Sequence, residues 1–388
     1  MATLYLHIPF CKRICSYCDF YKVGATALLP ATVEALHREM EQRRGYIEDK
    51  RLTSIYFGGG TPSLLHPTDI EQLIAKARSL FDCSAVEEIT IEANPDDLTE
   101  EYVEALAKTS VNRVSLGIQS FDDEILRFMN RRHSAEEAKA AVGRLRKAGI
   151  ENISIDLIFG VAGFGRERLH RSLEEAIALD VEHISAYHLT IEERTKLGLM
   201  LRKGEYQPLT DEESEEEYLI VHRALTRAGY EHYEVSNYAR EGYRAKHNSA
   251  YWTGVEYLGL GPGAHSFSGD NRTWCTSTAK EYAEGVMRYE DEQLTDVDHL
   301  NEYVMISLRR VEGIDLRFIE ERFGIAERRR IRHSAQPWIE CGALNEVGDW
   351  LRIPAEKFLV SDAVIESLFA YLRLIFRHIF WYFIFFSY

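Results

Sequence analysis

Strand-like and helix-like segments alternate through the first half of the chain. Short runs rich in β-branched and aromatic residues are typical of buried strands, and between them apolar residues recur with the period of a helix. Such alternation produces parallel strands joined by right-handed crossovers, so it predicts an α/β fold, either a TIM-like barrel or a doubly wound sheet. The predicted strands are 3–8, 54–60, 88–93, 113–119, 153–159 and 183–189, and the predicted helices are 31–44, 68–81, 136–149 and 167–180.

Polar side chains stand at or near the ends of three predicted strands, as Glu92, Gln119 and Asp156. In parallel α/β folds the carboxyl ends of the strands form the active face. Each of these residues taken alone is equally compatible with a capping or loop-bridging role. Three of them on neighbouring units predict a binding site at this edge of the sheet.

The second half of the chain differs in composition, and 388 residues are enough for more than one domain. We predict a core at 1–200, a barrel extension at 201–280 with a Gly-rich loop, and a mainly helical C-terminal domain at 281–371. Residues 372–388 are apolar and aromatic, unlike anything before them. They are too few for a transmembrane helix of about 20 residues. We expect this tail to lie outside the fold. Its apolar side chains are also compatible with peripheral association of the protein with a membrane.

The charge balance bears on partners and location. The chain has 62 acidic and 46 basic residues and a net charge of −16, which argues against nucleic acid as a partner. The first residues lack the basic region and cleavage site of a secretory signal, so we expect a cytoplasmic protein. In a reducing compartment, clustered cysteines bind metal or carry out redox chemistry more often than they form disulfides.

Three cysteines, Cys11, Cys15 and Cys18, form a CxxxCxxC motif after the first predicted strand. Structural zinc needs a fourth ligand, for which His7 is a candidate. A thioredoxin-type pair leaves Cys11 unexplained, and covalent haem attachment needs a histidine where Asp19 stands. Three thiolates on one loop suit a [4Fe–4S] cluster in which one iron has no protein ligand.

This spacing resembles the signature of the radical S-adenosylmethionine (SAM) proteins, and the resemblance extends over nearly the whole chain. It is similar to the branch that holds oxygen-independent coproporphyrinogen III dehydrogenase and the haem chaperone HemW. The resemblance implies a partial or complete TIM-like (β/α) barrel with a smaller, mainly helical C-terminal domain. The motifs that carry it are YLHIPFCKRICSYCDFY, IYFGGGTPSLL, IEANP, SLGIQSF, IDLIFG, ISAYHLTIE, YEVSNYA and LGLGPGAHSF.

The resemblance also implies the ligands of the site. Cys11, Cys15 and Cys18 would hold the [4Fe–4S] cluster, and the amino and carboxylate groups of SAM would chelate its fourth iron. An electron donor would reduce the cluster, which would cleave SAM to methionine and a 5′-deoxyadenosyl radical. Glu92 would bind the ribose, and Asp156 would lie near the adenosyl group. The implied SAM residues are Tyr5, Tyr17, Gly59, Gly60, Thr61, Glu92, Gln119, Arg131 and Asp156.

The segment HNSAYW contains the HNxxYW motif, with His247, Asn248, Tyr251 and Trp252. Imidazole is a common ligand of haem iron, and on a helix His247 and Tyr251 would share a face. Spacing alone also fits a surface histidine in a loop with structural hydrogen bonds. The resemblance to HemW proteins implies that these four residues bind haem.

Two differences separate this chain from the dehydrogenase. The dehydrogenase has a longer arm before its first cysteine and a further cysteine where this chain has Phe20. The resemblance therefore implies a haem chaperone that delivers haem to respiratory haem proteins, on a scaffold able to cleave SAM. The dehydrogenase, which converts two propionates to vinyl groups, is the first alternative. A cluster-carrying binding protein that never cleaves SAM is the second. The family usually continues with Leu-Pro-Gly-Gln after IDLIFG, and this chain has VAGFGRER at 161–168.

Overall fold

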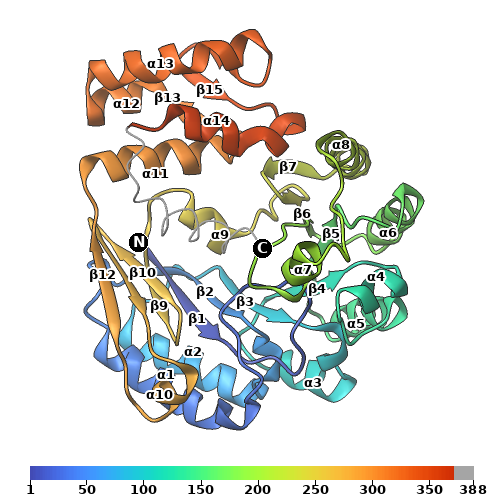
Figure 1. Ribbon diagram of the computed structural model, residues 1–388. Coiled ribbons are helices and arrows are strands. Elements are labelled where there is room, and N and C mark those ends of the chain that lie inside the picture. Colours follow the sequence, from blue (N-terminus) through green and yellow to red (C-terminus); the bar gives the residue numbers. More distant parts are fainter. Residues whose placement is uncertain (371–388) are drawn as a thin grey trace.

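A twelve-stranded sheet dominates the computed structural model, which describes residues 1–370 (Figure 1). Its strand order is β12-β11-β10-β9-β1-β2-β3-β4-β5-β6-β8-β7, and the pairs from β9 through β6 are parallel. The six predicted strands are confirmed. They are β1 Ala2–Ile8, β2 Leu52–Gly59, β3 Glu88–Ala93, β4 Arg113–Gln119, β5 Asn152–Phe159 and β6 His183–His188.

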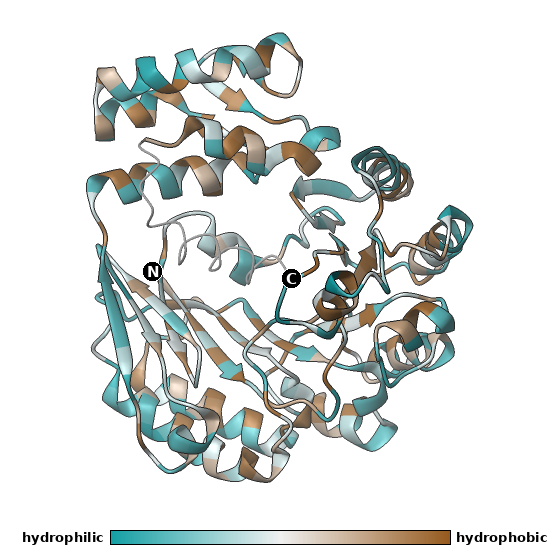
Figure 2. Ribbon diagram, viewed as in Figure 1, coloured by the Kyte–Doolittle hydropathy of each residue, from teal (hydrophilic) through white to brown (hydrophobic). Residues whose placement is uncertain are grey.

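Helices connect these parallel strands and cover the outer face of the sheet (Figure 1). Their apolar residues, such as Leu36, Ile70 and Leu145, are fully buried. Figure 2 shows the hydrophilic residues of these helices on the sides turned away from the sheet. The helices are α1 Leu29–Gln42, α2 Pro67–Leu80, α3 Glu100–Leu106, α4 Asp123–Phe128, α5 Ala135–Lys147 and α6 Arg166–Ala178.

Side-chain caps fix where several helices begin. Ser134 and Glu137 form a capping box at the start of α5, and Thr210 and Glu213 do the same at α8, Asp211–Arg227. The acidic run at 211–217 therefore begins at the N-terminus of a helix, where negative charge is favourable.

Antiparallel pairs extend the sheet beyond β9 on one side and beyond β6 on the other. On one side β9 pairs with β1, and β10 to β12 follow it; on the other side β8 and β7 follow β6. Hydrogen bonding does not join β12 to β7, so the described strands form a partial barrel, as the fold prediction allowed. The bounds are β7 Glu231–Glu234, β8 Asn237–Ala239, β9 Glu256–Leu260, β10 His265–Ser268, β11 Asn271–Cys275 and β12 Tyr289–Gln293. Shorter helices in this half are α7 Lys196–Arg202, α9 Lys246–Tyr251 and α10 Ala279–Ala283.

The C-terminal region is mainly helical, as predicted, with one three-stranded sheet in the order β13-β15-β14. It packs on the barrel partly through Tyr218, whose hydroxyl donates to the carbonyl of Ala355 at 2.6 Å. Within residues 1–370 no helix is both long and apolar enough to cross a membrane. The predicted aromatic tail at 372–388 lies outside the described residues. The elements are α11 Asp296–Leu308, β13 Ile314–Asp315, α12 Leu316–Phe323, α13 Ile325–Glu340, β14 Asn345–Val347, β15 Trp350–Arg352 and α14 Ser361–Leu368.

Candidate functional site

The inward-facing side chains of the barrel line a cavity of about 560 Å³. Side chains alternate between the two faces of a strand, so positions such as Arg113, Ser115 and Gly117 of β4 line this cavity together. The cavity brings together the three cysteines, the nine residues predicted to bind SAM, and His247, Asn248 and Tyr251 of the HNxxYW motif. Trp252 is not part of its lining and is buried in the hydrophobic core.

The cysteine loop follows β1 and is fixed by backbone hydrogen bonds on three sides. The N–H of Cys11 donates to the carbonyl of Val23 at 3.0 Å, and the N–H of Ser16 donates to that of Met129 at 3.0 Å. On the third side the N–H of Leu197 donates to the carbonyl of Ser16 at 2.8 Å. The loop therefore has a defined position between the end of β1, the end of α4 and the start of α7.

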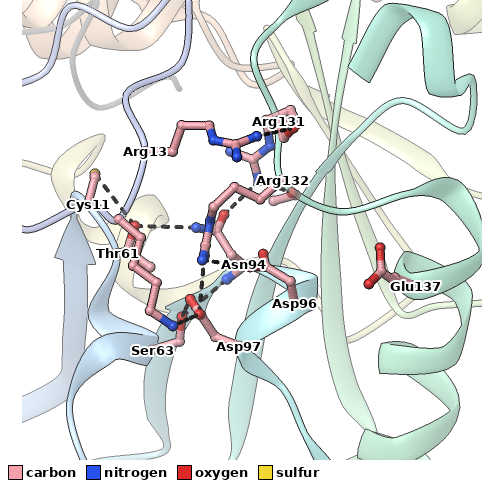
Figure 3. Close-up of polar contacts among 12 residues, drawn as sticks. Cys11, Arg13, Thr61, Ser63, Asn94, Asp96, Asp97, Arg131, Arg132 and Glu137 are labelled. Atoms are coloured by element: carbon pink, nitrogen blue, oxygen red, sulfur yellow. Dashed lines mark hydrogen bonds and ion pairs between the residues drawn. The ribbon is translucent and has the colours of Figure 1, made fainter. Parts of the chain in front are cut away.

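The three thiols are free cysteines that open onto the cavity. The Thr61 hydroxyl donates to the sulfur of Cys11 at 3.5 Å (Figure 3). The Arg131 guanidinium donates to the sulfur of Cys15 at 3.4 Å. Donors and a positive charge beside a sulfur atom favour its thiolate form. Burial acts in the opposite direction and raises the pKa of Cys18 to about 11.

These cysteines are not arranged around a single point. Across residues 1–370, no three His, Cys, Asp or Glu side chains converge closely enough to hold one metal ion. In an iron–sulfur cluster each thiolate binds a different iron, so its sulfur ligands lie further apart than around a single zinc ion. His7, the candidate fourth zinc ligand, lies 2.9 Å from the Tyr5 hydroxyl through Nδ1 and 3.4 Å from the Tyr21 carbonyl through Nε2. The three thiols therefore fit a cluster better than a single zinc ion.

A charged network ties the cysteine loop to the turn after β3 (Figure 3). The ammonium of Lys12 donates to Asp97 at 2.7 Å, and the same carboxylate accepts from Ser63 at 3.0 Å and Arg132 at 3.1 Å. Arg132 also pairs with Asp96 at 2.7 Å. Because Asp97 is almost fully buried, these bonds are shielded from water and hold the loop more firmly than exposed ion pairs would.

Arg131 links the cysteines to the predicted SAM residues. Its guanidinium donates to the side-chain oxygen of Asn94 at 2.6 Å and to the carbonyl of Gly117 at 2.5 Å, and Asn94 donates to Thr61 at 3.3 Å. Gln119 ends β4 with a φ of 70°, a left-handed conformation that is uncommon for residues other than glycine. Such conformations gather at ligand sites, where surrounding contacts hold them in place.

The glycines after β2 allow a close approach of the backbone. Gly59 has a φ of 112°, and a Cβ there would lie 2.6 Å from the ring of His7. A Cβ on Gly60 would lie 2.8 Å from the carbonyl oxygen of Phe10. Glycine is therefore required where β2 passes the segment that leads into the cysteine loop.

Glu92 is the central carboxylate of the cavity. It accepts from the Tyr56 hydroxyl at 2.8 Å and from the Gly59 N–H at 3.0 Å. Burial raises the pKa of Glu92 to about 7 and that of Asp156 to about 6. The negative charge of Asp156 raises the pKa of Glu92 further. Two carboxyls with raised pKa values in one cavity are typical of a functional site.

The raised pKa of Glu92 predicts an effect on stability. In the unfolded chain this carboxyl ionises near its ordinary 4.5, so between about pH 4.5 and 7 the folded state binds the proton more tightly. Its contribution to the free energy of unfolding therefore falls as the pH rises through this interval. Glutamine does not ionise in this range. The free energy of unfolding of Glu92→Gln, relative to that of the wild type, should therefore increase as the pH rises across this interval. Urea unfolding of both proteins across this range measures the difference, and parallel pH profiles would contradict it.

The HNxxYW motif forms helix α9, and His247 is buried with 1% of its surface exposed. Its Nδ1 lies 2.8 Å from the Ser54 hydroxyl, its Nε2 lies 3.0 Å from the Tyr251 hydroxyl, and its ring stacks on Tyr56 at 4.8 Å. The prediction that His247 and Tyr251 share a helical face is confirmed. The alternative of a surface histidine in a loop is wrong, because Glu88 accepts from the first N–H groups of α9 and fixes the helix against the sheet.

Sequence reasoning missed the cavity residues that lie deeper in the strands. Tyr56 of β2 and Arg113 of β4 line the cavity, and Arg113 shares its face of the strand with Ser115 and Gly117. The two-residue period of a strand therefore carried a signal for both residues, although neither stands at the carboxyl end of its strand, where functional side chains are expected. Asn94 stands within the quoted IEANP motif without an assigned role, and its bond to Arg131 supplies one.

Comparisons with known proteins find similarity in both sequence and fold. Residues 5–176 match the Radical SAM superfamily model, and residues 294–359 match the HemN C-terminal domain. A protein of Lactococcus lactis described as "Heme chaperone HemW" is 35% identical over 325 residues, which cover 83% of this chain and 85% of that protein. A Bacillus subtilis protein of the same description is 35% identical over 331 residues, covering 84% and 87%. The solved structure of coproporphyrinogen III oxidase (HemN) from Escherichia coli shares the fold, with a TM-score of 0.81, 22% identity, and coverage of 96% of this chain and 90% of that one.

Proposed function

The chain belongs to the HemW family within the radical SAM superfamily, and on that basis we propose that it is a haem chaperone that binds haem, SAM and a [4Fe–4S] cluster. The observation that carries the proposal is a continuous cavity with the cysteine loop at one end and the HNxxYW helix at the other. We further propose that the protein works in the cytoplasm, meets membranes only peripherally, and delivers haem to respiratory haem proteins.

In this proposal Cys11, Cys15 and Cys18 hold the cluster. Thr61 and Arg131 donate to two of these sulfur atoms and stabilise their charge. When bound and reduced by an electron donor, the cluster supplies one electron for the cleavage of SAM.

The residues between the two ends of the cavity would position SAM. Glu92 would accept from the ribose hydroxyls, and Asp156 would lie near the adenosyl group. The amino and carboxylate groups of SAM would chelate the iron that has no cysteine ligand. The remaining SAM contacts in this proposal are Tyr5, Tyr17, Gly59, Gly60, Thr61, Gln119 and Arg131, all of which line the cavity.

Haem would bind at α9, where His247 would coordinate its iron with Asn248 and Tyr251 beside it. Trp252 lies outside the cavity lining and has no place in this proposal. Burial lowers the pKa of His247 to about 3, so its imidazole is neutral at physiological pH, as a metal ligand must be. Both ring nitrogens already have hydrogen-bond partners within the protein. Iron coordination therefore requires one of these two hydrogen bonds to open.

A haem titration tests this proposal. We would reconstitute the cluster anaerobically and follow haem binding by absorbance in the wild type, His247→Ala and Tyr251→Phe, with the exposed His170→Ala as the matched control. The wild type and the control should bind haem stoichiometrically, and His247→Ala should lose about tenfold or more in affinity. Tyr251→Phe should bind more tightly, because Nε2 no longer has to give up a hydrogen bond of about 1 kcal/mol.

Three outcomes would contradict the proposal in different ways. An unchanged affinity in His247→Ala would reject His247 as the ligand. Absence of haem binding, together with protoporphyrinogen formation from coproporphyrinogen, would favour the coproporphyrinogen III dehydrogenase. Failure of the reduced protein to form 5′-deoxyadenosine from SAM would favour a binding protein that never cleaves SAM.

A further inference from the structure

Arg113, the first residue of β4, is a buried cation that lines the cavity. It is 2% exposed, and its Nε is buried without a hydrogen-bond partner. Across residues 1–370, its guanidinium forms no hydrogen bond with another residue and has no carboxylate within 4.0 Å. A charged group removed from water in this way is strongly unfavourable unless something compensates it.

The other two buried arginines of residues 1–370 are compensated. Arg272, 4% exposed, pairs with Glu292 at 3.5 Å and with Glu302. Arg309, 7% exposed, pairs with Asp362 at 2.9 Å. Arg113 differs from both in that its neighbouring carboxylates, Glu92 and Asp156, lie near enough for its charge to lower their pKa values but outside pairing distance.

The position of Arg113 indicates the ligand that it serves. Ser115 and Gly117 of the same strand line the cavity above it. Arg113 pairs with Thr90 of β3, two residues from Glu88, which accepts from the first N–H groups of α9, so Arg113 lies at the α9 end of the barrel. Arg113 begins β4, whereas the cysteine loop follows the end of the parallel strand β1. Seven residues at about 3.3 Å each place Arg113 roughly 20 Å from the cluster end of the barrel.

The chemistry that suits a buried guanidinium is a carboxylate, which it can bind through two parallel hydrogen bonds. The carboxylate of SAM belongs to the cluster end in the proposed function. Haem carries two propionate carboxylates, and α9 is its proposed site. We propose that Arg113 is the anion-binding residue of the haem site and that it receives a haem propionate. This inference rests on the proposed function.

Esterified haem tests the inference on the unaltered protein. In the dimethyl ester of haem both propionates lose their charge while the macrocycle and iron are retained. We expect the wild type to bind haem about 10 to 100 times more tightly than the ester, because a hydrogen bond to a charged group contributes about 1.5–3 kcal/mol. Equal affinities for haem and its ester would overturn the inference without the need for any variant.

Variants of Arg113 assign the effect to this residue. Arg113→Gln should bind haem about as weakly as the wild type binds the ester, and its affinity for the ester should be unchanged. Arg113→Lys should retain part of the preference for haem. SAM affinity, measured separately, should be the same in Arg113→Gln and the wild type. A loss of SAM binding with unchanged haem binding would assign the carboxylate to SAM and overturn the haem assignment.

Stability measurements show whether the variants remain folded. Removal of an uncompensated charge should leave the thermal stability of ligand-free Arg113→Gln equal to or above that of the wild type. The matched control, Arg272→Gln, should be less stable because Glu292 and Glu302 lose their buried partner. A wild type that binds neither haem nor its ester would reject the proposed function itself. That outcome differs from equal binding of the two ligands, which would reject only the role of Arg113.

Discussion

Replacement of Cys15 by alanine should abolish assembly of the iron–sulfur cluster. After anaerobic reconstitution, the variant should lack both the bound iron and the broad visible absorbance of the wild type. The expected effect is complete because each of the three thiolates would bind a different iron, and no other thiol is available on the loop. The same result is expected for Cys11→Ala and Cys18→Ala.

Two cysteines provide the matched controls. Cys83 and Cys341 lie outside the cavity lining, so Cys83→Ala and Cys341→Ala should assemble the cluster as the wild type does. Iron content and absorbance measured side by side separate loss of the cluster from general damage to the fold. Wild-type iron content in Cys15→Ala would contradict the assignment of the cysteine loop as the cluster site.

Glu92→Gln should lower the affinity for SAM on the order of 100-fold. The carboxylate is proposed to accept from the ribose hydroxyls, and charge-assisted hydrogen bonds of this kind contribute about 1.5–3 kcal/mol each. Glutamine has nearly the same shape, so the bond from Tyr56 can persist while the charge is lost. Equilibrium dialysis of reconstituted protein with labelled SAM measures the effect.

The measurement of SAM affinity includes a control variant and an expected dependence on pH. Glu71→Gln alters a carboxylate outside the cavity, where Glu71 accepts from Ser110, and should not change SAM affinity. In the wild type the affinity for SAM should increase as the pH rises through about 7, because burial raises the pKa of Glu92 to that value and only the ionised form carries charge. Equal SAM affinities in Glu92→Gln and the wild type would exclude Glu92 from the site.

The parallel core could be predicted from the sequence because the spacing of apolar residues in each strand and helix indicates which of its faces is buried. Glu92, Gln119 and Asp156 could be placed at one edge because parallel strands bring their carboxyl ends together. Contacts between distant segments gave no such signal. Lys12 and Asp97 are 85 residues apart, and Ser54 and His247 are 193 residues apart.

Arg113 was missed for a related reason. A charged residue at the start of a strand is usually exposed, since charged side chains are rarely buried without a partner. Its strand neighbour Thr90 lies two residues from Glu88, which holds α9, a six-residue helix from a later part of the chain. The local sequence around Arg113 contains no trace of that packing, so only the assembled structure reveals the buried cation.

Tyr56 belongs to both halves of the cavity, since its hydroxyl donates to Glu92 and its ring stacks on His247. A SAM ribose that donates to Glu92 would compete with the Tyr56 hydroxyl for this carboxylate. It would therefore change the interactions of the ring that stacks on His247. In the proposed function SAM and haem would therefore share a coupling free energy. The factor by which SAM alters the affinity for haem must equal the factor by which haem alters the affinity for SAM. The sign of that coupling determines whether SAM helps to load haem or to release it.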